Sequence, residues 1–116
     1  MTNPLIVKRE KNDETGVVTI HLKGRLDMTS LDPFKEVFTH EFNEKNYKIV
    51  LNMAEVFFIV STHLGVIMSS YKDTQANDGD LKFSSLTEEV YGIFDLLQLT
   101  SILNIYPNDE EAASDF

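Results

Sequence analysis

The chain has 116 residues, 42% of them hydrophobic, so its length suits one domain built around one core. Nineteen acidic residues against ten basic ones give a formal net charge of −9, which repels phosphate backbones and argues against nucleic acid as a partner. The absence of cysteine excludes disulfides, thiolate catalysis and thiolate metal sites.

The first third of the chain predicts two strands and a helix. Residues 5–10 contain a short apolar run, residues 12–16 are turn-forming, and residues 17–23 alternate between apolar and polar, which together predict a hairpin. The helix is expected to begin near Asp32, a capping residue, with Pro33 at its first position. Its core-facing stripe has helical spacing and comprises Phe34, Val37, Phe38 and Phe42.

The middle of the chain continues this alternation of strands and helices. Residues 47–53 predict a strand that is buried on both faces, and a helix follows it for which Ser61 is a candidate N-cap. Residues 81–83 predict a further strand, and the next helix begins at a capping residue, either Ser85 or Thr87. The apolar stripes of these two helices are Leu64, Ile67, Met68 and Tyr71, and Val90, Ile93, Phe94 and Leu97.

The end of the chain predicts a last strand over residues 102–106 and an acidic tail over residues 109–116, interpreted as a solvated end with a short helix. Because strands and helices alternate after the first hairpin, the expected fold is an α/β domain. Its sheet has four to five strands, is mixed and is parallel in its later strands, and amphipathic helices cover it.

Two segments resemble the STAS domain, the family of sulfate transporter and anti-sigma-factor antagonist domains. Residues 22–27, Leu-Lys-Gly-Arg-Leu-Asp, match the family's Leu-x-Gly-x-Leu-Asp signature. Residues 60–66, Val-Ser-Thr-His-Leu-Gly-Val, stand where the family usually has Asp-Ser-Ser/Thr-Gly-Leu-Gly. Length and element order agree as well, so the resemblance implies a single STAS domain over residues 1–116, with residues 109–116 as its tail.

Similarity to stand-alone bacterial members implies a cytoplasmic partner-switching protein that antagonises an anti-sigma factor. The resemblance implies that the unphosphorylated form binds a kinase-like anti-sigma factor, and that phosphorylation of the motif's first serine, which falls on Ser61, ends that binding. The residues that the resemblance implies for partner binding lie in the two motif segments and are Arg25, Asp27, Met28, Ser61, Thr62 and His63.

Two residues depart from the family pattern, because Val60 replaces the usual acidic residue and His63 replaces the usual glycine. The histidine is expected to place a bulky ring at the partner-facing start of the helix. These departures leave a second hypothesis open, a scaffolding domain that is not phosphorylated and assembles with other copies or with a signalling complex.

No catalytic set accompanies Ser61, since His63 is two residues away and points to a different helix face, so an enzyme is not expected. Neither a cofactor nor a metal site is expected, because His21, His40 and His63 show no ligand spacing. The chain also lacks an apolar run of about 18 residues and a signal-peptide pattern, so no membrane association is expected.

Overall fold

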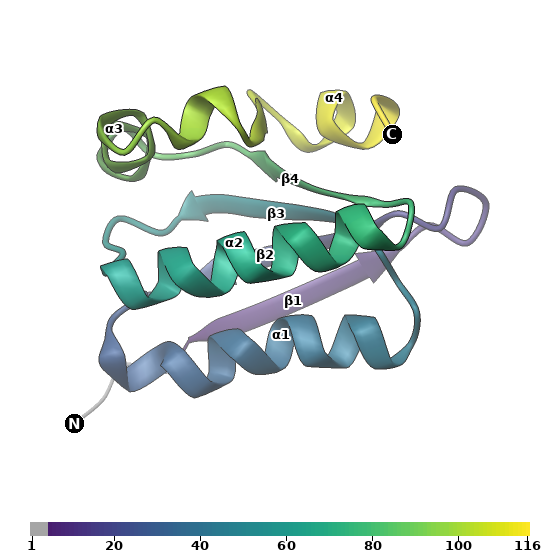
Figure 1. Cartoon of the computed structure of the whole chain (residues 1–116), viewed down its shortest axis with the longest axis horizontal. Helices are drawn as coiled ribbons and strands as arrows, with labels where there is room; N and C mark the ends of the chain where they lie inside the picture. The colour runs from purple at the N-terminus through teal and green to yellow at the C-terminus, as the bar shows by residue number, and fades with distance from the viewer. Residues whose placement is uncertain (1–4) are drawn as a thin grey trace.

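The computed structural model describes residues 5–116, which form five strands and four α-helices (Figure 1). The strands are β1 (Ile6–Lys11), β2 (Val18–Lys23), β3 (Lys48–Glu55), β4 (Asp80–Ser84) and β5 (Asn104–Tyr106). The helices are α1 (Leu31–Asn43), α2 (Ser61–Ala76), α3 (Glu88–Leu96) and α4 (Asp109–Ser114), with 3₁₀ turns η1 (Met28–Ser30) before α1 and η2 (Leu99–Ser101) before β5. The predicted order of strands and helices is confirmed.

The strands form one mixed sheet in the order β1-β2-β3-β4-β5. The hairpin pair β1 and β2 is antiparallel, whereas β2, β3, β4 and β5 pair in parallel. A helix connects each parallel strand to the next, as crossover connections require. The prediction of a mixed α/β sheet is therefore confirmed, and the sheet has five strands.

One face of the sheet carries the main core. Along β2 the side chains of Val18, Ile20 and Leu22 point to this face, as the period-two pattern predicts. Helices α1 and α2 run side by side over it (Figure 1) and supply buried residues such as Phe34 and Ile67. Helix α3 completes the same core, and its residues Val90 and Phe94 are fully buried.

The opposite face is covered in part by α4, which corrects the prediction of a solvated acidic tail. Ala112 of α4 is fully buried against Val17 and Val50. The Asp109 carboxylate accepts hydrogen bonds from Ser84 Oγ at 2.5 Å and from Asn52 Nδ2 at 2.9 Å. The segment is held to the sheet because Ala112 packs against Val17 and β3, and the Asp109 carboxylate bonds to side chains of β3 and β4.

The start of α1 lies two residues before the predicted one, and the start of α3 falls at one of the two predicted caps. Helix α1 begins at Leu31 with Ser30 as its N-cap, so Asp32 lies inside the first turn instead of capping it. Thr87, not Ser85, caps α3, and its Oγ1 accepts a hydrogen bond from the Val90 amide at 3.4 Å. Sequence patterns place such boundaries only to within one or two residues, because neighbouring capping residues compete.

Candidate functional site

Two loops form the candidate site, one after β2 and one after β3, at the carboxyl edge of the parallel strands. The Leu26 amide donates to the Phe58 carbonyl over 3.0 Å, and the Val60 amide donates to the Leu26 carbonyl over 2.9 Å. Leu26 and Ile59 also form an isolated parallel bridge. The two sequence motifs are therefore adjacent in space, at the edge where open α/β sheets bind their ligands.

The start of α2 is exposed and lacks a side-chain cap. Val60 is the N-cap in an extended conformation, with φ −101° and ψ 161°, and its apolar side chain cannot accept a hydrogen bond. Ser61 is the first helical residue, so the prediction that Ser61 is the N-cap is wrong by one position. The first turn also carries no acidic side chain. Its open N–H groups and the helix dipole therefore favour an anion next to the exposed Ser61 hydroxyl.

Thr62 extends this exposed surface towards the loop after β2. Its hydroxyl lies 3.4 Å from the sulfur of Met28, and both residues are exposed. Met28 is 62% exposed although it is a large apolar residue, so it presents a flexible hydrophobic surface beside Ser61 and Thr62. Three of the predicted partner-binding residues thus share one solvent-facing surface.

Arg25 and Asp27 lie in the same loop and face each other. The Arg25 guanidinium lies 4.1 Å from the centroid of the Phe58 ring, and its Nε is 3.4 Å from an Asp27 carboxylate oxygen. A hydrogen bond from the Thr29 hydroxyl, at 2.5 Å, holds the pKa of Asp27 below its usual value, so this carboxylate is ionised at neutral pH. The ionised group also accepts from the Thr29 amide and caps the 3₁₀ turn η1.

His63 is fully buried, so the prediction that its ring faces a partner is wrong. The ring packs on Phe34 with centroids 5.1 Å apart, and Nε2 lies 3.3 Å from the Ser30 hydroxyl. Burial lowers the pKa of His63, and Nδ1 finds no hydrogen-bond partner among residues 5–116. The histidine therefore ties the start of α2 to the turn before α1 from inside the core.

Phe57 and Phe58 belong to the exposed surface, although the sequence analysis did not select them as site residues. They are 59% and 37% exposed, and they lie in the loop that leads to Ser61. Aromatic residues are enriched at protein interfaces and are uncommon on solvent-exposed loops. Their position between a buried strand and the motif serine was the signal that could have identified them.

The exposed hydroxyl groups of Ser61 and Thr62 suit this surface to binding and to modification. A nucleophilic serine needs a base within hydrogen-bond reach, but the neighbouring histidine is buried and directed towards Ser30. Within residues 5–116, no three His, Cys, Asp or Glu side chains gather in a way that could hold a metal ion. In that same part of the chain, no helix is both long enough and apolar enough to span a bilayer.

Proteins of known class resemble the chain over most of its length. It is 26% identical over 104 residues to the anti-sigma-B factor antagonist of Bacillus subtilis, which covers 90% of this chain and 91% of the relative. It is 26% identical over 107 residues to the anti-sigma F factor antagonist of Paenibacillus polymyxa, with 91% and 92% covered.

Solved structures share the fold. A Thermotoga maritima protein, provisionally assigned as an anti-sigma factor antagonist, matches with a TM-score of 0.86 at 28% identity, covering 94% of this chain and 92% of that one. The unphosphorylated form of the anti-sigma factor antagonist SpoIIAA matches with a TM-score of 0.71 at 19% identity, with 95% and 96% covered. The STAS domain model matches residues 8–112, and the chain therefore belongs to the STAS domain family.

Proposed function

We propose that this protein is an anti-sigma-factor antagonist that binds a kinase-like anti-sigma factor while Ser61 is unphosphorylated. The observation that carries the proposal is the exposed Ser61 hydroxyl on an uncapped helix start, beside the exposed loop residues Arg25 and Met28. The curated relatives, which are named as antagonists of anti-sigma factors, support the same class of partner.

Phosphorylation of Ser61 would release the partner through electrostatics at the interface. A phosphoserine adds about −1.5 to −2 charges at neutral pH. The free N–H groups and the dipole of α2 stabilise that charge within the folded chain. A bound partner would have to desolvate the same charge against its own surface, which costs affinity. Phosphorylation of Ser61 is therefore expected to have a large effect on partner binding and a small effect on folding.

Structural neighbours support the small effect on folding. A Bacillus SpoIIAA structure in the phosphorylated form matches this chain with a TM-score of 0.71 at 17% identity, the same TM-score as the unphosphorylated form. The fold of that protein is thus retained in both states. This similarity supports an STAS fold that tolerates a phosphate.

The proposal describes a regulator that acts by binding and not by catalysis. With a net charge of −9, the chain is expected to act on a protein partner, and nucleic acid is not part of the proposed mechanism. A cytoplasmic location remains a prediction, as does the absence of a cofactor and of a membrane partner.

A phosphorylation assay with the anti-sigma factor from the same host tests the proposal. The purified chain is incubated with the kinase-like anti-sigma factor and ATP, and the modified residue is mapped by mass spectrometry. We expect one phosphate on Ser61, none on the Ser61→Ala variant, and unchanged modification of the Thr62→Ala control. Binding without any modification of Ser61 would contradict the switching step, and absence of binding would contradict the proposed function.

The second hypothesis, a scaffolding domain that is not phosphorylated, keeps one supporting observation. Val60 still replaces an acidic residue that a kinase could recognise, whereas His63 no longer supports this hypothesis because its ring is buried. Light scattering of the purified chain at high concentration separates the two. A defined oligomer that persists on dilution favours the scaffold, and a monomer favours the antagonist.

A further inference from the structure

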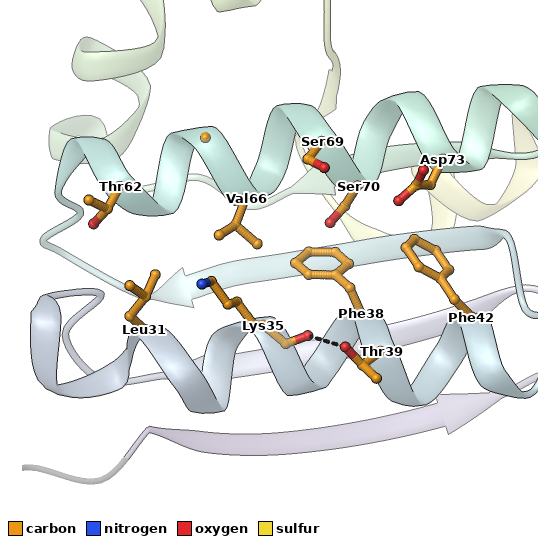
Figure 2. A pocket seen from close by; sticks show the side chains of 11 residues that line it. Leu31, Lys35, Phe38, Thr39, Phe42, Thr62, Val66, Ser69, Ser70 and Asp73 are labelled. Carbon is orange, nitrogen blue, oxygen red and sulfur yellow. Dashed lines mark hydrogen bonds between the residues drawn. The ribbon is translucent and has the colours of Figure 1, made fainter.

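A groove runs between α1 and α2 on the outer surface of the helix layer (Figure 2). Its volume is about 570 Å³. Phe38, Phe42 and Val66 supply its apolar lining, and Figure 2 shows their side chains between the two helices. Lys35 of α1 and Asp73 of α2 add opposite charges to the lining. The groove is therefore apolar along its middle and carries one charge of each sign.

The length and openness of the groove suit a helix better than a small molecule. The groove lining on α2 extends from Thr62 to Asp73, twelve residues that span about 16 Å, or about three turns, at the rise of an α-helix. Small-molecule sites usually enclose most of the ligand surface, whereas this groove opens to solvent between two parallel helices. A third helix can bury its apolar stripe in such a groove.

Gly65 leaves room in the groove for close approach by another chain. It lies inside α2 and lines the groove, and a Cβ built at this position meets nothing within 4 Å among the described residues. Glycine within a helix is less stable than alanine there, but without a Cβ it lets another backbone approach closely. Since nothing in residues 5–116 occupies the space beside Gly65, this part of the groove is open to the backbone of another chain.

The groove is continuous with the proposed partner surface, because Thr62 belongs to both. A specific protein interface buries about 20 to 30 residues on each side. The exposed residues around Ser61 are far fewer, so a partner that covers Ser61 must also cover adjacent surface. The groove begins one residue from Ser61 and offers apolar area in that direction.

We infer that this groove receives an amphipathic helix of the same anti-sigma factor that covers Ser61, an inference that rests on the proposed function. The helix has about three turns, with an apolar stripe against Phe42 and Val66 over the buried ring of Phe38. It carries an acidic residue facing Lys35 and a basic residue facing Asp73. Its backbone approaches α2 at Gly65, where a longer side chain would keep the two helices apart.

Affinity measurements with matched glycine variants test the inference. Gly65→Leu fills the approach site, and Gly92→Leu introduces the same change on α3, where the added Cβ also meets nothing within 4 Å. We expect Gly65→Leu to weaken binding to the anti-sigma factor at least about tenfold, while Gly92→Leu stays within about twofold. Charge reversal at Lys35 or Asp73 is expected to weaken binding by about two- to fivefold.

Cysteine protection locates the helix directly, because the chain has no cysteine of its own. Ser69→Cys places a thiol in the groove, and Ser114→Cys places one on α4. Alkylation of Cys at position 69 is expected to slow at least about tenfold in the complex, with no change at position 114.

The outcomes separate the inference from the proposed function. If the wild-type chain does not bind the anti-sigma factor, both fail. If it binds and Gly65→Leu binds equally well, or Ser69→Cys stays unprotected, the groove is not the docking site while the proposed function stands. If the wild-type chain self-associates in light scattering and the Gly65→Leu variant does not, the groove binds a second copy of the chain. The inference is then overturned.

Discussion

The N-termini of helices α2 and α4 are built in opposite ways. At α4, the Asn108 side chain accepts from the Glu111 amide at 2.9 Å, three acidic residues occupy the first turn, and Asp109 bonds to Ser84 and Asn52. At α2, the N-cap is a valine, the first turn has no acidic residue, and Ser61 is exposed. The N-terminus of α4 is therefore hydrogen-bonded within the chain, whereas the N-terminus of α2 is open to an incoming anion.

This difference separates residues that stabilise the fold from residues available for binding. A carboxylate at a helix start stabilises both the dipole and the free N–H groups. Helix α2 lacks that contribution, and its start is held instead from the inside, by the contacts of His63 with Phe34 and Ser30. The start of α2 is thus positioned from the core side by His63 and from the neighbouring loop by the Val60–Leu26 backbone hydrogen bond.

The largest expected effect is at the N-terminus of α4, whose polar groups are hydrogen-bonded within the chain. Asp109→Ala removes the acceptor of two hydrogen bonds and leaves Ser84, which is fully buried, without it. We expect the free energy of unfolding to fall by about 2–3 kcal/mol, in the range for hydrogen bonds to charged groups. Asp109→Asn keeps an acceptor oxygen and should lose less than half as much. Urea denaturation measures both, and a loss below about 0.5 kcal/mol for Asp109→Ala would show that α4 is only loosely attached.

A smaller effect on the free energy of unfolding is expected from pH, because the buried His63 supports the start of α2 from inside the core. Burial lowers the pKa of His63, so the unfolded chain binds its proton at a higher pH than the folded chain does. The contribution of His63 to the free energy of unfolding is therefore fully present above its pKa in the unfolded chain, 6.5. This contribution is lost as the pH falls towards the lower pKa of His63 in the folded chain. Urea denaturation at several pH values measures this, and the free energy of unfolding should change less between pH 7 and 5.5 in His63→Phe than in wild type. Equal changes would mean that His63 does not carry the effect.

A further small effect, of opposite sign, is expected inside α2. Gly65→Ala adds a methyl group where nothing lies within 4 Å among residues 5–116. The free energy of unfolding should rise by about 0.5–1 kcal/mol, because alanine is the better helix former. Thermal denaturation would show a higher midpoint. A lower midpoint would mean that the space beside Gly65 is needed by the chain itself.

The smallest expected effect is at the open start itself. Ser61→Ala should change the free energy of unfolding by less than about 0.5 kcal/mol, because the Ser61 hydroxyl is exposed and caps nothing. The corresponding loss for a true N-cap is about 0.5–2 kcal/mol. A loss above about 1 kcal/mol in urea denaturation would restore Ser61 as a structural cap and would weaken the contrast with α4.

Hydrophobic periodicity was sufficient to predict the sheet and the three main helices. The alternation in residues 17–23 and the helical stripe that includes Phe34 and Phe38 depend only on local spacing. Local spacing could not predict that the two motifs lie side by side, because the contact between Leu26 and Ile59 joins positions 33 residues apart. It followed from the resemblance to the STAS family, and the structure supplies its physical basis.

The errors have specific causes. His63 belongs to a buried stripe with Ile67, Ser70 and Thr74, at helical spacing of three and four residues, but its three polar members concealed the stripe. The docking of α4 depends on Asn52 and Ser84, which are distant in sequence from Asp109. Such contacts have no local signature, so an acidic segment gave no indication that it would pack.

Calorimetric titration of the anti-sigma factor with wild type, Ser61→Ala and Ser61→Asp tests the central claim most directly. The aspartate adds a charge that α2 accommodates, so that variant should fold as stably as wild type. It should bind at least about tenfold more weakly, or about 1.4 kcal/mol, while Ser61→Ala binds like wild type. Ser114→Asp, which adds the same charge on α4, should leave affinity unchanged. Equal affinities for Ser61→Asp and wild type would contradict the account, because the open start of α2 would then lie outside the interface.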